Sequence, residues 1–180
     1  DDVFEKIRGR KLLDIKLKAI ESAGKAGLRV ILVPTIIRGV NNHQLGDLVR
    51  LTFENLNVIT GISLQPIAFT GRYSEVDRLE QRYTLADICH DISRQTGLTD
   101  PMQDWVSLNV STPFVSLAEA LNGKSVINYS CHPHCGALSI LYVDQNKNAV
   151  PITRFIDLYN LLEDINRLAA KTEQRRFKMF

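Results

Sequence analysis

The sequence predicts an α/β fold, because helical and strand-like segments alternate along its first half. Apolar side chains recur at helical spacing in residues 11–26, and the β-branched run at residues 28–33 is typical of a buried strand. A second helix over residues 43–55 and a second buried strand over residues 59–69 follow. The order helix, strand, loop, helix, strand indicates repeated βα units around a parallel sheet.

A third helix begins after Thr84, whose hydroxyl can cap it with the help of Asp87 three residues later. Gly97 is a suitable helix end. Residues 98–112 follow no regular pattern, and residues 114–121 favour a short helix.

The remaining segments predict a small α+β extension. Residues 137–143 and 149–152 flank a polar turn, which is typical of a β-hairpin. A C-terminal helix is expected from about Arg154, followed by a loosely held basic tail from Lys171. We therefore divide the chain into residues 1–97, with the βα units, and residues 98–180, the extension.

The composition excludes several classes of function. Hydrophobic residues make up 44% and charged residues 23%, as in ordinary globular proteins. The formal net charge of +2 is too small to favour nucleic acid or an anionic membrane as a partner. No apolar run approaches the roughly 20 residues of a transmembrane segment. Acidic residues are scattered, and we expect them on solvated faces.

Three cysteines, Cys89, Cys131 and Cys135, are an odd number, which argues against a disulfide framework and favours a reducing cytoplasm. Cys89 lies on the apolar stripe of the third helix and is expected to pack in the core.

Cys131 and Cys135 lie in the segment Cys-His-Pro-His-Cys. Thiolates are soft ligands that suit iron–sulfur clusters, zinc and copper(I). With His132 and His134 they could nominally form a four-ligand zinc site, but ligands on so short a loop rarely reach all tetrahedral corners. A turn with two free thiols is the other interpretation, and the residues alone leave both open.

Small and polar residues follow or close the two buried strands. In βα folds ligands bind at the carboxyl ends of the parallel strands, so these residues are candidates for binding a polar cofactor. Ordinary turn chemistry explains them equally well. They are Thr35, Arg38, Gly39 and Asn41 after the first strand, and Gln65, Pro66, Thr70, Gly71 and Arg72, which follow or close the second.

Six short motifs in order carry a family resemblance over nearly the whole chain. They are Phe-Glu-Lys-Ile-Arg-Gly-Arg-Lys-Leu-Leu-Asp-Ile-Lys at 4–16, Leu-Val-Pro-Thr-Ile-Ile-Arg-Gly-Val-Asn at 32–41, Leu-Gly at 45–46, Leu-Gln-Pro with Phe-Thr-Gly-Arg at 64–66 and 69–72, Cys-His-Pro-His-Cys-Gly at 131–136, and Val-Pro-Ile-Thr-Arg-Phe-Ile-Asp at 150–157.

The series resembles the C-terminal half of radical S-adenosylmethionine (radical SAM) proteins related to the archaeal tetraether lipid synthase and to the enzyme proposed to methylate the methanopterin precursor. It is more distantly similar to the molybdenum-cofactor protein A enzymes. The resemblance implies the C-terminal part of a partial (βα)6 TIM-type barrel. In the family, a [4Fe–4S] cluster reduces S-adenosylmethionine to a 5′-deoxyadenosyl radical.

The resemblance also implies what the chain lacks. The family holds its [4Fe–4S] cluster with Cys-x3-Cys-x2-Cys, and that motif does not occur in residues 1–180. We therefore expect a fragment of an enzyme for carbon–carbon bond formation or methylation on a lipid or pterin-like substrate, inactive alone. The start at Asp1, without Met, also suggests a boundary. The missing N-terminal half of its own chain and a reductant such as ferredoxin or flavodoxin are the expected partners.

Carried over by residue, the resemblance makes Thr35, Arg38, Gly39, Asn41, Gln65 and Pro66 candidates for contacting S-adenosylmethionine. It makes Cys131 and Cys135 ligands of an auxiliary iron–sulfur site whose other ligands cannot be named. Half a barrel leaves an open sheet edge, through which the chain could form a homo-oligomer. Two alternatives remain: a non-catalytic zinc- or iron-binding module, and a structural fragment without metal.

Overall fold

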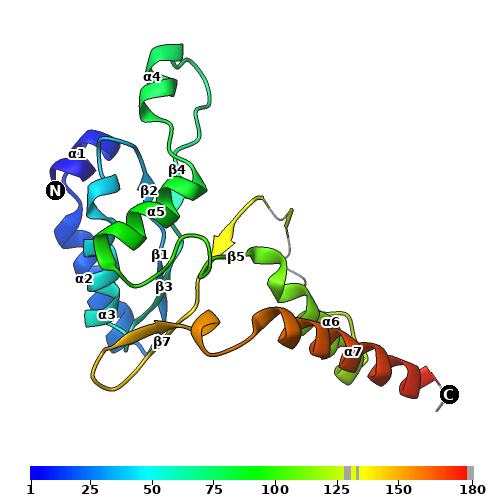
Figure 1. The fold of residues 1–180 in the computed structure, drawn as a ribbon. Coiled ribbons are helices and arrows are strands. Elements are labelled where there is room, and N and C mark those ends of the chain that lie inside the picture. The colour runs from blue at the N-terminus through cyan, green and yellow to red at the C-terminus, as the bar shows by residue number, and fades with distance from the viewer. Residues whose placement is uncertain (128–130, 133, 178–180) are drawn as a thin grey trace. The chain divides into compact units, whose positions relative to one another are not determined.

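The computed structural model describes residues 1–127, 131–132 and 134–177. The chain forms two compact units, Asp1–Gly97 and Leu98–Phe180 (Figure 1). Both combine helices with short strands, as expected for an α/β protein.

Unit 1 is built on two pairs of short parallel strands. Strand β1 (Val30–Leu32) pairs with β3 (Ile59–Ile62), and β2 (Thr35–Ile36) pairs with β4 (Gln65–Pro66). The chain therefore runs twice in the same direction through β1–β2 and β3–β4. This parallel arrangement confirms the βα order that the sequence predicted.

Helices connect the strands of unit 1, and α3 packs against both β3 and α5 (Figure 1). The core beneath them contains Ile36, Leu45 and Ile59, which are fully buried. The helical elements are α1 (Asp2–Arg8), α2 (Leu13–Lys25), the 3-10 turn η1 (Asn42–Gln44), α3 (Leu45–Glu54), α4 (Glu75–Gln81) and α5 (Leu85–Thr96).

Several predictions for unit 1 are confirmed and one is wrong. Thr84 and Asp87 form a reciprocal capping box at the start of α5, and Gly97 ends the helix in the left-handed conformation. The second strand was predicted as one run over residues 59–69, but it is interrupted between β3 and β4. Helices α1 and α4 were not predicted, and α4 projects away from the rest of the unit (Figure 1).

Unit 2 contains two small antiparallel strand pairs and two helices in contact with each other. Strands β7 and β8 form the predicted hairpin across residues 144–148. The elements are β5 (Val106–Ser107), the 3-10 turn η2 (Leu108–Ser111), α6 (Thr112–Asn122), β6 (Ala137–Leu138), β7 (Leu141–Val143), β8 (Ala149–Pro151), the 3-10 turn η3 (Ile152–Arg154) and α7 (Leu158–Phe177).

Three predictions for unit 2 need correction. Residues 137–138 were assigned to the hairpin, but they form β6 and pair with β5. The last helix begins at Leu158 instead of Arg154, which lies in η3. The tail from Lys171 was expected to be loosely held, yet α7 continues to Phe177, and residues 178–180 lie outside the described residues.

Asp104 anchors unit 2 from the inside, against the prediction that acidic residues lie on solvated faces. Its side chain is fully buried, and it accepts hydrogen bonds from Thr153 Oγ1 at 2.6 Å and from Arg154 at 2.8 Å. The Asp100 N–H donates to it at 2.6 Å. Burial opposes the charge, but these donors and the Arg154 cation outweigh it and lower the pKa of Asp104. One carboxylate thus joins the irregular segment to η3.

The β1 strand leaves apolar side chains uncovered. Ile31 is 61% exposed and Val33 57%, whereas the alternate residues Val30 and Leu32 are half-buried. Successive side chains of a strand point to opposite faces, so one face of this sheet is packed and the other is open in the described chain.

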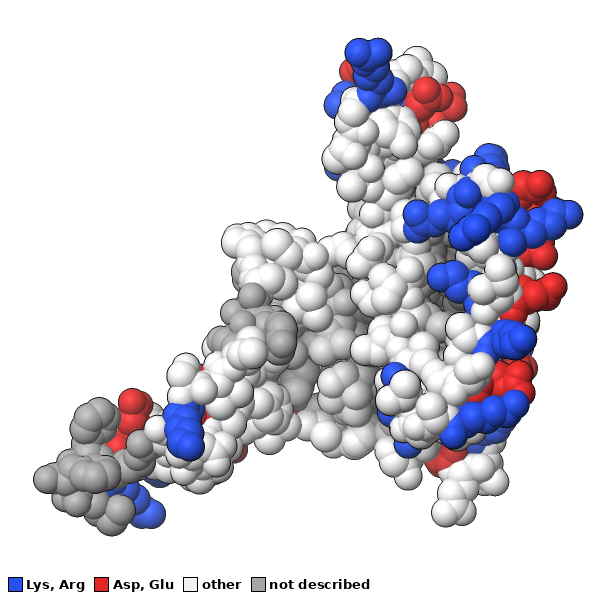
Figure 2. Space-filling model, turned by 180° about the vertical axis from the view of Figure 1, so that it is seen from behind, with Lys and Arg blue, Asp and Glu red and all other residues white. Residues whose placement is uncertain are grey.

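The charged side chains do not separate by sign on the face that Figure 2 shows. Along the side of unit 1 that carries α1 and α2, Lys and Arg lie interspersed with Asp and Glu. Across the described ranges, no helix has both the length and the apolar character needed to cross a bilayer.

Candidate functional site

The carboxyl ends of the strand pairs bring two of the predicted site residues together. Thr35 in β2 is the register partner of Gln65 in β4, and Ile36 is the partner of Pro66. The Gln65 N–H donates to the Pro34 carbonyl at 3.0 Å, which fixes this register. Residues 30 positions apart in sequence therefore lie side by side where the strands end.

The polar side chains of this pair are available for a ligand. Within the described residues, neither the Thr35 hydroxyl nor the exposed Gln65 amide takes part in a hydrogen bond. A hydroxyl and an amide together offer donors and acceptors, as a polar cofactor with both kinds of group requires. This part of the site fits S-adenosylmethionine.

Asn41 shapes the loop that follows β2. It is only 8% exposed, its Oδ1 accepts from the Ile37 N–H at 2.8 Å, and its Nδ2 donates to the Thr35 carbonyl at 2.9 Å. Both ends of the amide thus bind the chain's own backbone. The structure places this predicted cofactor ligand inside the turn, where it holds the loop against β2.

Gly39 lies at the tip of the same loop with a φ of 72°, a conformation that side chains with a Cβ adopt only at a cost. Its N–H donates to Asn42 Oδ1 at 2.8 Å. Nothing lies within 4 Å of the position that a Cβ would occupy. Glycine is therefore required here by the backbone conformation and not by lack of space.

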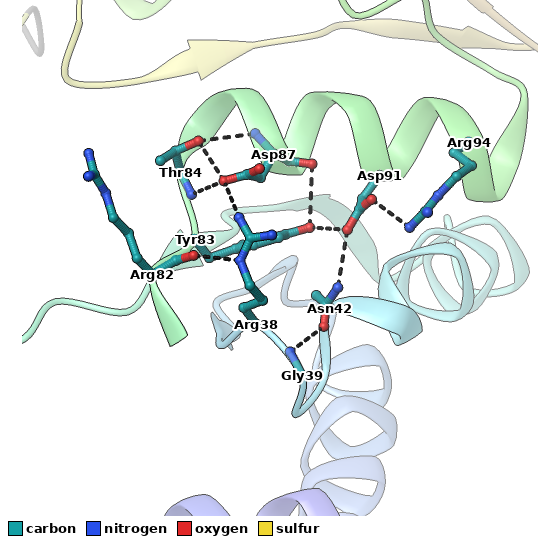
Figure 3. Close-up of polar contacts among 9 residues, drawn as sticks. All are labelled: Arg38, Gly39, Asn42, Arg82, Tyr83, Thr84, Asp87, Asp91 and Arg94. Atoms are coloured by element: carbon teal, nitrogen blue, oxygen red, sulfur yellow. Dashed lines mark hydrogen bonds and ion pairs between the residues drawn. The ribbon is translucent and has the colours of Figure 1, made fainter. Parts of the chain in front are cut away.

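Arg38 turns from this loop toward the start of α5 (Figure 3). Its Nε donates to the Arg82 carbonyl at 2.7 Å, and its guanidinium lies 3.0 Å from the Asp87 carboxylate. The guanidinium also lies 5.6 Å from the centre of the Tyr83 ring, within cation–π range. The charge of this predicted cofactor ligand is thus already paired.

Asp87 serves the α5 cap and Arg38 at the same time. Its Oδ2 accepts from the Thr84 N–H and hydroxyl, both at 2.8 Å. Partial burial disfavours its charge, but the Thr84 hydrogen bonds and the Arg38 cation outweigh this effect and lower the pKa of the Asp87 carboxyl. Asp87 is therefore an anion that holds the Arg38 side chain.

Asp91, one helical turn later, binds the other side of the loop (Figure 3). Its Oδ2 accepts from the Tyr83 hydroxyl at 2.5 Å and from Asn42 Nδ2 at 3.3 Å, and its Oδ1 accepts from Arg94 at 2.7 Å. Burial and the hydrogen bond to the Asp91 anion raise the pKa of Tyr83. Tyr83 therefore stays protonated and donates to Asp91.

Sequence reasoning missed Tyr83 and Asp91. The available signal was the spacing of Asp87 and Asp91, because residues four apart lie on one face of a helix. Two carboxylates on the same face of a helix indicate that this face contacts another segment of the chain. Here that segment is the loop after β2.

Cys131 and Cys135 lie at a turn in unit 2, in which the Cys135 N–H donates to the His132 carbonyl at 2.8 Å. Both are free thiols, Cys131 half-buried and Cys135 exposed. Partial burial and the hydrogen-bonded Cys135 thiol raise the pKa of Cys131. Two neighbouring thiols on one turn fit two ligand positions of an iron–sulfur cluster.

The imidazoles of His132 and His134 lie close together, with ring centres 5.2 Å apart. Across the part of the chain that the structure describes, however, no three His, Cys, Asp or Glu side chains gather in a way that could hold a metal ion. Cys89 is buried at 6% exposure, and burial raises its pKa to about 11. Its predicted packing role is therefore confirmed.

Comparison with known proteins gives three relatives, and no protein-family model matches. The chain is 40% identical over 157 residues to a 7,8-dihydro-6-hydroxymethylpterin dimethyltransferase of Methanocaldococcus jannaschii, covering 87% of this chain and 31% of that protein. The chain thus spans about a third of the length of this relative.

The other two relatives are GTP 3′,8-cyclases. A probable GTP 3′,8-cyclase of Aeropyrum pernix is 41% identical over 51 residues, which is 28% of this chain and 14% of that protein. A GTP 3′,8-cyclase of Rhizobium etli is 30% identical over 99 residues, or 55% of this chain and 27% of that protein. Together with the ordered motifs, these similarities show that the chain belongs to the radical SAM proteins related to this pterin dimethyltransferase and these GTP 3′,8-cyclases.

Proposed function

We propose that the chain is the part of a radical SAM enzyme that contacts S-adenosylmethionine at the carboxyl ends of β1–β4 and serves methylation or carbon–carbon bond formation. The printed names of the relatives support a pterin-like substrate. One is a pterin dimethyltransferase and two are cyclases of GTP, so all three names concern a fused nitrogen heterocycle. These names favour a pterin-like substrate over a lipid.

The observation that carries this proposal is the pairing of Thr35 with Gln65. It puts two polar side chains that make no hydrogen bond to other described residues at the strand ends, where α/β folds bind ligands. The shaped loop from Arg38 to Asn41 begins directly beside them.

The open face of β1 supports the C-terminal part of a partial (βα)6 barrel. Ile31 and Val33 would face the interior of such a barrel and be covered by further strands. The free edge of β1 would pair with one of those strands. In their absence a second copy of the chain could cover the same edge.

Cys131 and Cys135 would supply two thiolates to an auxiliary iron–sulfur cluster, which would add a redox centre to the protein. The radical-generating cluster would be held elsewhere, because residues 1–180 contain no Cys-x3-Cys-x2-Cys. A reductant such as ferredoxin or flavodoxin in a reducing cytoplasm would be the electron donor.

Replacing Gln65 with alanine is expected to weaken S-adenosylmethionine binding about tenfold, as for the loss of one or two hydrogen bonds to a ligand. Equilibrium dialysis with labelled S-adenosylmethionine measures the effect. Gln145→Ala is the matched control, since this exposed glutamine lies in the turn of the β7–β8 hairpin. Equal affinity in the wild type and Gln65→Ala would contradict the proposed site.

A second candidate function is a non-catalytic zinc- or iron-binding module. The thiol contact of Cys131 with Cys135, and the adjacent imidazoles of His132 and His134, favour it. Metal content separates the two functions, because zinc without sulfide indicates the module and iron with labile sulfide indicates a cluster.

A further inference from the structure

The side-chain amide of Asn42 links the loop after β2 to helix α5. One end of this amide accepts hydrogen bonds and the other donates them. Asn42 Oδ1 accepts from the Gly39 N–H at 2.8 Å, and its Nδ2 donates to Asp91 at 3.3 Å. A carboxylate can only accept hydrogen bonds, so Asp91 fixes which end of the amide faces Gly39. The orientation of Asn42 thus depends on a residue of another element.

Asp91 is itself firmly placed. Its side chain is 16% exposed, and the Tyr83 hydroxyl, at 2.5 Å, donates to the same oxygen that accepts from Asn42. Tyr83 is 4% exposed, and its hydroxyl lies within hydrogen-bond reach of the Asp91 carboxylate and the Asp87 carbonyl. The chain of hydrogen bonds therefore runs from Tyr83 through Asp91 and Asn42 to Gly39.

Helix α5 also holds the other parts of this loop. Asp87 pairs with Arg38 on the opposite side of Gly39. Gln95 donates to the Asn42 carbonyl and accepts from the Gly46 N–H, both at 2.8 Å. Three side chains of α5, Asp87, Asp91 and Gln95, thus contact the loop on both sides of its left-handed glycine. Figure 3 shows the Asp87 and Asp91 contacts.

We propose that Asp91 is a positioning residue, which holds the loop from Arg38 to Asn42 in the conformation that receives S-adenosylmethionine. This proposal rests on the function proposed above. It divides the candidate residues into two groups: Thr35 and Gln65 contact the ligand, whereas Arg38 and Asn41, like Asn42, use their side chains to shape the loop.

Asp91→Ala is expected to speed hydrogen exchange at the Gly39 amide about tenfold, since Asn42 is then free to turn away. The same substitution should weaken S-adenosylmethionine binding to a similar degree. Asp91→Asn should restore both, because its side-chain oxygen can still accept from Tyr83 and Asn42. Arg94→Ala is the control, since Arg94 is 72% exposed and its loss leaves the loop contacts intact.

Unchanged Gly39 exchange in a folded Asp91→Ala protein would overturn the proposal. The proposal would also be overturned if Asp91→Ala lost S-adenosylmethionine affinity only in proportion to a loss of global stability against urea. Asp91 would then have a purely structural role. If Asp91→Ala does not fold, Tyr83→Phe removes one hydroxyl and should still speed Gly39 exchange; no change would count against the proposal. If the wild type does not bind S-adenosylmethionine, the proposed function fails, and Gly39 exchange still decides whether Asp91 positions the loop.

Discussion

Replacing Cys131 with serine is expected to remove most of the iron and labile sulfide from the anaerobically reconstituted protein. A serine hydroxyl is a hard and weakly acidic group, so it does not replace a thiolate on iron. Cys135→Ser should have the same effect, because both thiols lie on one turn. Metal and sulfide analysis, together with the visible absorption of the cluster, measures the loss.

Cys89→Ala is the matched control, because Cys89 is buried in unit 1 and should leave the metal content unchanged. Iron and sulfide that are equal in Cys131→Ser and the wild type would contradict the auxiliary site. The pH dependence has a defined sign. Because the pKa of Cys131 is raised, a metal ion must displace the proton of this thiol in order to bind. The amount of metal bound should therefore decrease as the pH falls.

Asp104→Ala is expected to destabilise unit 2 by about 3 kcal/mol, at the lower end for breaking a buried ion pair. The lower end applies because Arg154, which loses its partner, is 46% exposed and stays hydrated. Thr153 and the Asp100 N–H lose their acceptor as well. Urea unfolding followed by the fluorescence of Trp105, the only tryptophan, reports on this unit.

Asp164→Ala provides the control, because this aspartate of α7 is 69% exposed and its ion pair with Arg167 should contribute less than about 1 kcal/mol. If both variants unfold at the same urea concentration as the wild type, Asp104 does not anchor the unit.

The contribution of Asp104 also depends on pH in a predictable direction. Its pKa is lower in the folded chain than the roughly 3.9 of an unfolded aspartate. The stabilisation is therefore complete above that value and disappears as the pH falls through the folded pKa. The difference in unfolding free energy between the wild type and Asp104→Asn should narrow below a pH of about 4.

The order of the main elements could be predicted because it depends on local patterns. The capping box at Thr84, the glycine end at Gly97 and the hairpin across residues 144–148 are each set by neighbouring residues. The break between β3 and β4 could not be predicted, because the apolar Leu64 lies within it and apolar residues continue on both sides. Likewise, the pairing of residues 137–138 with β5 depends on a segment about 30 residues away.

The candidate site could be predicted only in part, for the same reason. The strand-end positions of Thr35 and Gln65 follow from the βα order. The ion pair of Arg38 with Asp87 and the hydrogen bond of Asn42 to Asp91 depend on how α5 packs against the loop. No local sequence pattern contains that information. Asp104 was missed because its two side-chain donors, Thr153 and Arg154, lie about 50 residues further along the chain.

Hydrogen exchange in the presence and absence of S-adenosylmethionine tests the central claim most directly. The ligand is predicted to slow exchange in residues 35–41 and 65–67, at the carboxyl ends of the paired strands. Gly39 is the most informative amide, because its hydrogen bond belongs to the loop itself. Protection confined to other segments would contradict the strand-end site. An example is protection of the α6 and α7 residues that line a cleft of about 580 Å³ between these helices.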